Sequence, residues 1–261
     1  MILSKSIDII TGSCSVESKE ESLRQATYLY KHNINKMRFM IWKPRTNPES
    51  YQGIGVEGLE FVLAIVDKYP NFFTFTTEVM SQRQVDVINR FSNQYGIPFI
   101  YQVGTRNAQN FELLKYIATM ENQNILYKRG MSMTIQEYIE GSKYLNPMKN
   151  NILLCLRGIR TFETETRNTS DIDAVCILKS RFEFTENTHY KVYFDPSHAT
   201  GHRKYIHPLA LSAIIAGADG LEIEIHSNPD EAMSDAKQTI SFDDMTKLLS
   251  QIQKLYYAFD Y

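Results

Sequence analysis

The feature that most constrains the fold of this sequence is a repeated alternation of a short apolar run with a longer segment of helical periodicity. Short runs rich in β-branched and aromatic residues predict buried strands, and apolar residues three and four positions apart predict amphipathic helices. The pattern occurs eight times along the chain. The predicted strands are residues 7–11, 37–42, 72–77, 99–103, 125–128, 152–156, 192–194 and 221–225.

Each predicted strand is followed by a predicted helix, and Ser81 and Thr134 are expected to cap two of these helices. The predicted helices are residues 20–31, 56–68, 81–91, 108–120, 134–144, 173–179, 208–216 and 242–257. Eight strand-then-helix units predict a parallel sheet closed into a (β/α)8 TIM barrel, a single domain over residues 1–261. The alternative is an open doubly wound sheet, but no GxGxxG or GxxxxGK[ST] motif follows any predicted strand.

Composition excludes several functional classes. A hydrophobic fraction of 43% and a charged fraction of 22% are typical of a soluble globular protein. The net charge of -2 does not favour nucleic acid or an anionic membrane as a partner, and we expect neither a membrane span nor a secretory leader. The three cysteines form no CxxC pair, which favours the reducing cytoplasm.

Unusual polar residues cluster at or just after the predicted strand ends. Because those ends share one mouth in a barrel, the side chains should face a single cavity. The basic residues among them are Arg38, Lys43, Arg45, Arg106, Lys128 and Arg157, with Glu78 also at a strand end. So basic a cavity predicts polyanionic substrates, most simply two phosphorylated ones, since arginine grips phosphate through forked hydrogen bonds.

A second set of residues at the same mouth suits a divalent metal. Cys14, His198, Glu224 and Asp235 offer a thiolate, an imidazole and two carboxylates. This mixture fits a borderline first-row ion better than magnesium or calcium. Strand alternation places Glu222 on the same side as Glu224, so at least one buried carboxylate needs a partner. That partner is either a metal or an arginine or lysine side chain.

Several segments resemble the 3-deoxy-D-arabino-heptulosonate 7-phosphate (DAHP) synthases, type I beta branch. The resemblance covers nearly the whole chain in order and is carried by residues 43–53, 104–110, 127–130, 157–163, 195–198, 221–226 and 234–238. It implies a metal-dependent barrel that condenses phosphoenolpyruvate with erythrose 4-phosphate at the first step of the shikimate pathway. The cofactor implied is a divalent ion, Mn²⁺, Fe²⁺, Co²⁺ or Zn²⁺.

The resemblance also implies roles for individual residues. Cys14, His198, Glu224 and Asp235 would be the metal ligands. The phosphoenolpyruvate set would be Arg106, Lys128 and Arg157, with Arg38, Lys43 and Glu78 beside it. Pro44, Arg45 and Thr46 would hold erythrose 4-phosphate. Lys128, Cys14 and His198 are the expected catalytic residues, and we expect arginine neighbours to lower the pKa of Lys128 so that it can transfer protons.

The chain departs from the family pattern at three places. Phe39, Met40 and Ile41 stand where small residues are usual, Ser13 where proline is usual, and His202 where arginine is common. Bulky side chains after Arg38 could narrow the site, so the same chemistry on another phosphosugar aldehyde, as in the octulosonate 8-phosphate synthases, is an alternative. A silent barrel that only binds metabolites is a second alternative. We further expect a homo-oligomer, dimer or tetramer, and no feedback inhibition of this chain by aromatic amino acids.

Overall fold

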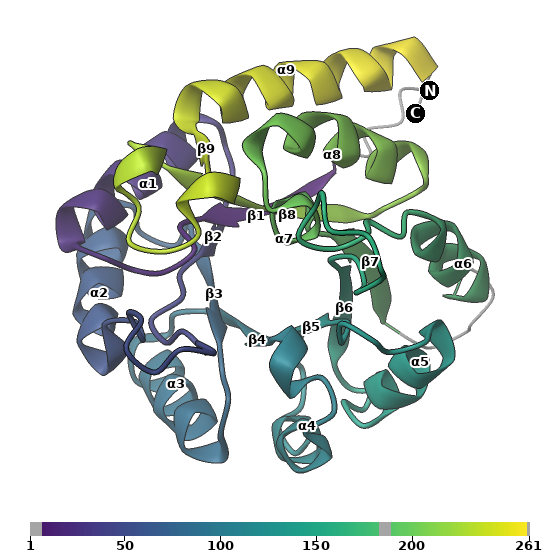
Figure 1. The fold of residues 1–261 in the computed structure, drawn as a ribbon. Coiled ribbons are helices and arrows are strands. Elements are labelled where there is room, and N and C mark those ends of the chain that lie inside the picture. The colour runs from purple at the N-terminus through teal and green to yellow at the C-terminus, as the bar shows by residue number, and fades with distance from the viewer. Residues whose placement is uncertain (1–6, 183–188, 260–261) are drawn as a thin grey trace.

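The computed structural model describes residues 7–182 and 189–259. Their architecture is a closed parallel barrel surrounded by helices (Figure 1). The barrel strands are β1 (Asp8–Gly12), β2 (Lys36–Arg38), β3 (Thr74–Glu78), β4 (Phe99–Val103), β5 (Asn124–Lys128), β6 (Asn151–Leu156), β7 (Tyr190–Phe194) and β8 (Gly220–His226). The main helices are α1 (Lys19–Lys31), α2 (Gly58–Lys68), α3 (Gln82–Tyr95), α4 (Phe111–Ala118), α5 (Ile135–Lys143), α6 (Asp173–Phe182), α8 (Ile206–Ile215) and α9 (Phe242–Phe259).

Neighbouring strands pair in parallel in chain order, and β8 returns to pair with β1. In this closing pair Ile9 lies opposite Leu221, and Gly12 lies opposite Glu224. Closure places the carboxyl ends of all eight strands at one rim, where the loops that precede the helices meet. The prediction of a (β/α)8 barrel is therefore confirmed.

Two apolar regions stabilise the barrel. The larger lies between the sheet and the outer helices and contains most of the buried hydrophobic side chains. The smaller lies inside the barrel and consists of Ile10, Ile100, Leu126, Leu153, Cys155 and Tyr193. Below this layer Asp8 contacts both Lys36 and the hydroxyl of Tyr193, which closes the amino-terminal end of the barrel with a polar contact.

The predicted second strand was too long, since β2 ends at Arg38. Phe39, Met40 and Ile41 are nevertheless buried. Phe39 N–H still donates to Thr76 O of β3 at 2.7 Å, whereas the carbonyls of Met40 and Ile41 accept from Val16 N–H and Gly55 N–H, outside the barrel strands. An apolar run reports burial whether or not the backbone continues a sheet ladder. Here the chain stays buried after the strand has ended, so the apolar run continues past Arg38.

Short elements also escaped prediction. The most important is α7 (Pro196–Thr200), a single turn directly after β7 that carries His198. Asp195 caps this turn, accepting a hydrogen bond from His198 N–H at 2.9 Å, and Pro196 occupies its first position. The second is β9 (Ile240–Ser241), which pairs with β8 outside the barrel. Neither is long enough to produce a readable periodicity.

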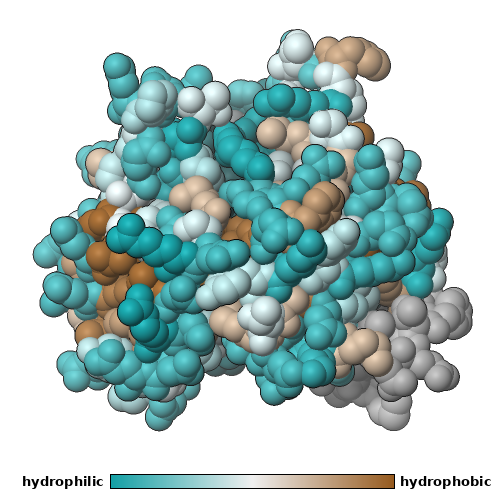
Figure 2. All heavy atoms as spheres, turned by 90° about the horizontal axis from the view of Figure 1, so that it is seen from below, coloured by the Kyte–Doolittle hydropathy of each residue, from teal (hydrophilic) through white to brown (hydrophobic). Residues whose placement is uncertain are grey.

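The outer surface is mostly hydrophilic on the face seen in Figure 2, as expected for the solvent side of the helices. One hydrophobic area lies at the left of that view, on the side of the molecule where Figure 1 places α2 and α3. Among the residues that the structure describes, no helix has the length and apolar character needed to cross a lipid bilayer.

Candidate active site

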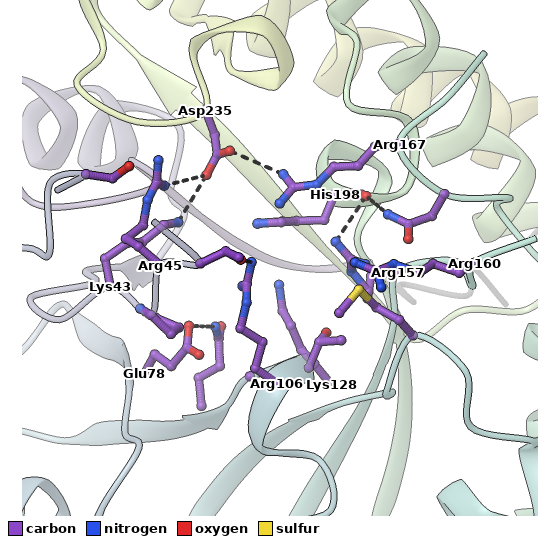
Figure 3. Close-up of a pocket in the computed structure, with 18 of the residues that line it drawn as sticks. Lys43, Arg45, Glu78, Arg106, Lys128, Arg157, Arg160, Arg167, His198 and Asp235 are labelled. Atoms are coloured by element: carbon purple, nitrogen blue, oxygen red, sulfur yellow. Dashed lines mark hydrogen bonds and ion pairs between the residues drawn. The ribbon is translucent and has the colours of Figure 1, made fainter. Parts of the chain in front are cut away.

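The loops at the carboxyl rim of the barrel surround a cavity of about 270 Å³. Every predicted site residue except Cys14 and Glu224 lines this cavity, and those two are buried at its edge. Figure 3 shows Lys43 and Arg45 on one side, Arg157 and Arg160 on the other, and Lys128 and Arg106 rising between them. The structure thus brings together side chains from all eight strand ends.

Further polar residues of the cavity were not predicted. They are Asn47, Ser50, Gln102, Thr105, Arg160, Arg167 and Asn168. Arg160, Arg167 and Asn168 belong to the long polar segment between β6 and α6. A polar loop of this length after a barrel strand was itself a signal, because loops on this rim carry function. Which of its arginines turns inward depends on the path of the loop.

The four candidate metal ligands form one compact cluster. One ligand atom from each of Cys14, His198, Glu224 and Asp235 lies within 4.8 Å of all the others. Two ligands of a single ion can be separated by at most about 4.6 Å, twice a metal–sulfur bond of about 2.3 Å. The cluster can therefore close around one ion with small side-chain movements. Asp235 also has a left-handed backbone, φ 54°, which is costly for a non-glycine residue and typical of functional sites.

Neighbouring groups orient these ligands as a metal site requires. Asp195 Oδ2 lies 2.7 Å from His198 Nδ1, which leaves Nε2 facing Glu224 at 3.4 Å. The Gln238 amide donates to Glu224 Oε2 at 2.7 Å, while its oxygen accepts from Arg167. A carboxylate on the second nitrogen of a ligating histidine is the usual arrangement around zinc and related ions. Within the described residues Glu224 Oε1 accepts no hydrogen bond, although Arg38 Nη1 lies 2.9 Å from it as an ion pair, so this oxygen can still coordinate a cation.

Burial sets the protonation of two of these ligands. Desolvation, reinforced by the charge of Glu224, raises the pKa of the Cys14 thiol from 9.0 to about 12. Desolvation also lowers the pKa of His198 despite the nearby carboxylates of Asp195 and Glu224, so the imidazole is neutral at pH 7. A neutral imidazole is the form that binds a metal. The Lys43 ammonium contacts the Cys14 sulfur and lies 3.3 Å from Asp235 Oδ2, where it offsets negative charge.

Six side chains in and behind the cavity wall form a closed series of contacts, which we call the charge ring. Its members, in order of contact, are Arg38, Glu222, Lys128, Asp195, His198 and Glu224. The sequence predicted that a buried carboxylate here would need a metal or a basic side chain as its partner. For Glu222 the partners are Arg38 and Lys128. Burial alone would lower the pKa of Arg38, but Glu224, Cys14 and Glu222 together raise it well above its ordinary value.

The prediction that arginine neighbours lower the pKa of Lys128 was wrong. Burial favours the neutral amine, but the carboxylates of Asp195 and Glu222 outweigh burial and raise the pKa above its usual 10.5. The Nζ atom lies 2.5 Å from Asp195 Oδ2 and 2.6 Å from Glu222 Oε2. Lys128 is therefore a permanent cation. The sequence places arginines near it, but only the fold shows that two carboxylates lie closer.

Arg157 is the opposite case, a buried cation without a carboxylate partner. The residue is 4% exposed and its Nη2 donates to the carbonyl of His198 at 3.3 Å, while its Nη1 finds no partner among the residues that the structure describes. Burial, together with the charges of Arg167 and Arg106, lowers its pKa from 12.5 to about 10. A buried, unpaired guanidinium is costly unless an anion completes it. The protein thus presents an anion site that its own carboxylates do not fill.

Glu78 lies in the cavity wall, where it fits closely against Gly104 and accepts a hydrogen bond from Gln102. A Cβ at Gly104 would lie 1.9 Å from Glu78 Oε1, so only glycine leaves room for this carboxylate. Gln102 donates to Glu78 Oε2 at 3.2 Å. Burial raises the pKa of Glu78 above 4.5, although Lys43, Lys128 and Arg38 act against it. This carboxyl group is consequently easier to protonate than an exposed one.

The unusual residues after Arg38 do not narrow the cavity. Phe39 packs edge-on against Phe75, with ring centroids 5.6 Å apart, and Ile41 joins the core between sheet and helices. Met40 is fully buried, and its sulfur accepts from Glu78 N–H at 3.1 Å. His202 is exposed and lines a neighbouring hollow together with Arg167 and Lys237. The group that contacts the His198 ring nitrogen is Asp195.

Comparison with protein-family models identifies a match over residues 4–259 to the DAHP synthetase I family. A curated phospho-2-dehydro-3-deoxyheptonate aldolase of Thermotoga maritima is 38% identical over 248 residues, which is 95% of this chain and 69% of the relative. A 2-dehydro-3-deoxyphosphooctonate aldolase of Protochlamydia amoebophila is 27% identical, over 95% of this chain and 90% of the relative.

Solved structures give the same picture. The crystal structure of the Thermotoga maritima DAHP synthase superposes with a TM-score of 0.86 at 36% identity, covering 98% of this chain and 71% of that one. A truncated form of the 3-deoxy-D-arabino-heptulosonate 7-phosphate synthase of the same organism gives a TM-score of 0.83 at 34% identity, covering 98% of this chain and 89% of that one.

Proposed function

This chain belongs to the DAHP synthetase I family, and we propose that it acts as a metal-dependent DAHP synthase through the cavity described above. The reaction joins phosphoenolpyruvate, erythrose 4-phosphate and water to give DAHP and inorganic phosphate, the first step of the shikimate pathway. The observation that carries the proposal is a buried, unpaired arginine, Arg157, facing the same cavity as a four-ligand metal cluster.

Phosphoenolpyruvate fits the inner, strongly basic part of the cavity. We assign its phosphate to Arg157 and Arg106, and its carboxylate to Lys128. An anion at Arg157 would accept the hydrogen bond that its buried Nη1 does not make in the described structure. Binding is favoured there because it offsets the free-energy cost of the unsatisfied donor. Arg38 stays in the charge ring, where it pairs with Glu222 and Glu224.

Erythrose 4-phosphate fits the outer part, against the segment Lys43-Pro44-Arg45-Thr46. Arg45 lies 3.6 Å from Asp235 Oδ2, and Arg106 Nη2 donates to Thr46 Oγ1 at 3.4 Å. These weak, partly exposed contacts leave Arg45 available for the phosphate of erythrose 4-phosphate, while Arg106, assigned above to phosphoenolpyruvate, lies between the two parts of the cavity. The aldehyde of erythrose 4-phosphate would then lie toward the candidate metal ligands Cys14, His198, Glu224 and Asp235. Holding both substrates in one cavity removes much of the entropic cost of their encounter.

The four-residue cluster suits Mn²⁺, Fe²⁺, Co²⁺ or Zn²⁺, and we propose that one of these ions is the native cofactor. When bound, the ion supplies a Lewis acid for the aldehyde oxygen of the acceptor. Carbon 3 of phosphoenolpyruvate forms a bond to the aldehyde carbon, and the former aldehyde oxygen takes up a proton. Water adds at carbon 2 and gives up a proton, which balances that uptake. The bond between carbon 2 and the phosphate oxygen then breaks, and the proton of the new hydroxyl passes to the departing phosphate as the ketone forms.

Proton transfer falls to a group other than Lys128. The permanent charge of Lys128 favours a fixed hydrogen-bond donor that holds phosphoenolpyruvate and stabilises negative charge. Glu78 lines the same cavity, and its raised pKa brings it closer to the working pH. We therefore assign to Glu78 the proton that leaves water as it adds at carbon 2.

A phosphate-release assay tests the proposed function. With phosphoenolpyruvate and erythrose 4-phosphate, the purified chain should release phosphate when Mn²⁺ or Co²⁺ is present and lose the activity after exhaustive chelation. A five-carbon aldose phosphate in place of erythrose 4-phosphate distinguishes an octulosonate-type reaction. Faster turnover of the five-carbon acceptor would overturn the assignment of the acceptor, and turnover unaffected by chelation would remove the metal. Phosphate release that survives both Cys14→Ala and His198→Ala would come from a contaminant, and would favour a silent metabolite-binding barrel.

A further inference from the structure

Glu222 is a fully buried carboxylate for which the reaction described above has no use. It projects from β8 into the barrel, is 1% exposed, and lies two residues before the proposed metal ligand Glu224. Its two oxygens have different partners: Oε1 accepts from Arg38 Nε at 2.9 Å, and Oε2 lies 2.6 Å from Lys128 Nζ. A carboxylate that bridges two cations fixes the distance between them.

The geometry at Lys128 explains why a second carboxylate matters. An ammonium group has three N–H donors in tetrahedral arrangement. Lys128 Nζ donates to Asp195 Oδ2 at 2.5 Å and forms an ion pair with Glu222 Oε2 at 2.6 Å, and the Nζ end of the side chain lies in the cavity wall (Figure 3). With two carboxylates held against it, the ammonium keeps donor capacity for a ligand in the cavity that Lys128 lines. One carboxylate alone would leave the ammonium free to rotate and tilt.

Asp195 alone is poorly placed to hold Lys128, because it has two other tasks. Its Oδ2 also lies 2.7 Å from His198 Nδ1, and its Oδ1 caps α7 through the His198 N–H. Glu224, the other carboxylate of the charge ring, is paired with Arg38 and proposed as a metal ligand. Glu222 is the member of the ring whose side-chain oxygens serve only cations and the weak Cys155 thiol contact at 3.7 Å.

We propose that Glu222 is a positioning residue for substrate binding: by bridging Arg38 and Lys128 it aims the Lys128 ammonium at the carboxylate of phosphoenolpyruvate. The inference rests on the proposed function, because it takes phosphoenolpyruvate as the ligand of Lys128. Glu222 itself touches no substrate, since the cavity wall does not include it. Its effect therefore passes through Lys128.

A double-mutant cycle tests this coupling. The dissociation constant of phosphoenolpyruvate is measured by calorimetry with Mn²⁺ present and no acceptor, so that no turnover occurs. Glu222→Gln and Lys128→Met should each weaken binding about tenfold, which is about 1.4 kcal/mol. The double variant should bind within about twofold of Lys128→Met, because a positioning residue has no effect once its target is absent. Losses that multiply in the double variant would overturn the proposal.

Glu222→Asp separates positioning from charge compensation. The shorter side chain keeps the negative charge in the barrel but cannot reach Arg38 and Lys128 together. We expect a melting temperature near that of the wild type with weaker phosphoenolpyruvate binding. Unchanged binding in this variant would also overturn the proposal. It provides the test if Glu222→Gln, which leaves two buried cations under-compensated, fails to fold.

Asp8→Asn is the matched control. Asp8 likewise bridges two groups inside the barrel, Lys36 and Tyr193, but at the opposite end. Its loss should lower the melting temperature and leave phosphoenolpyruvate binding unchanged. If Asp8→Asn weakens binding as much as Glu222→Gln, the effect is a general loosening of the barrel and the proposal is wrong. If the wild type does not bind phosphoenolpyruvate, the proposed function fails instead.

Discussion

Arg157 illustrates how a single residue can be costly for the fold and useful for binding. Arg129, its counterpart at the end of β5, is buried to the same 4% but pairs with Asp171 and donates to the carbonyl of Met133. In the described part of the chain, the Arg157 guanidinium donates only to the carbonyl of His198. The two arginines therefore separate the cost of burying a charge from the benefit of pairing it.

Arg157→Met should raise the KM for phosphoenolpyruvate roughly 10- to 100-fold, the usual value of hydrogen bonds to a charged group. The melting temperature should stay the same or rise, because the substitution removes an unpaired buried cation. Steady-state kinetics and thermal unfolding measure the two effects. Arg129→Met is the control: it should lower the melting temperature, since Asp171 loses its partner, and leave KM unchanged. A strongly destabilised Arg157→Met would contradict this account.

At the scale of single elements, local chemistry decides where helices begin. The predicted caps Ser81 and Thr134 are confirmed at the starts of α3 and α5. At α5 the arrangement is reciprocal, since Thr134 Oγ1 accepts from Glu137 N–H at 3.2 Å and Glu137 Oε2 accepts from Thr134 N–H at 2.7 Å. Such a cap depends on four consecutive residues, so the sequence alone is sufficient to predict it.

Thr134→Ala removes this cap and should destabilise the protein by about 1 kcal/mol. In a chain of this size that corresponds to a fall of about 2–4 °C in melting temperature. Turnover should not change, because α5 starts outside the cavity wall. The control Thr119→Ala removes an exposed threonine at the end of α4, with expected effects below about 0.5 kcal/mol. Equal losses in the two variants would show that the cap contributes nothing.

At the scale of the whole molecule, the cluster of four candidate metal ligands includes residues that follow the first and the last strand of the barrel. Cys14 follows β1, and Asp235, which lies 221 positions away in sequence, follows β8. Ser15 and Ser234, each next to one of these ligands, are 3.2 Å apart through their hydroxyls. A metal bound here would link loops whose strands already pair at the closing seam of the barrel.

Metal binding should accordingly stabilise the whole barrel, and more strongly at higher pH. Burial and Glu224 raise the pKa of the Cys14 thiol to about 12, so the chelated protein carries a thiol at neutral pH. Binding as thiolate releases that proton, and the apparent affinity should rise by about tenfold per pH unit from pH 6.5 to 8.5. His198 adds little to this slope, because its pKa is lowered and it is already neutral there.

Co²⁺ titrations of the chelated protein at several pH values measure the slope, with the melting temperature as a second readout. In the metal-free protein the raised pKa of the Cys14 thiol stabilises the folded state. This contribution is fully present below pH 9, the ordinary pKa of a thiol, and is lost as the pH rises toward 12. Cys14→Ser should remove the pH dependence along with most of the affinity. An affinity independent of pH in the wild type would mean that Cys14 is already ionised, or is not a ligand.

The sequence by itself determined the eightfold alternation of strand and helix and the closed barrel. It also determined that basic residues and candidate metal ligands gather at one rim. These follow from local periodicity and from the rule that parallel strand ends meet at one edge, neither of which depends on distances between remote residues. Only the tertiary structure decided the partners. It placed Glu222 between Arg38 and Lys128, reversed the expected pKa shift of Lys128, left Arg157 unpaired, and turned Phe39 and Ile41 away from the cavity. The reason is physical: an electrostatic shift depends on separations of a few ångströms between side chains from different strands, and those separations exist only once the barrel closes.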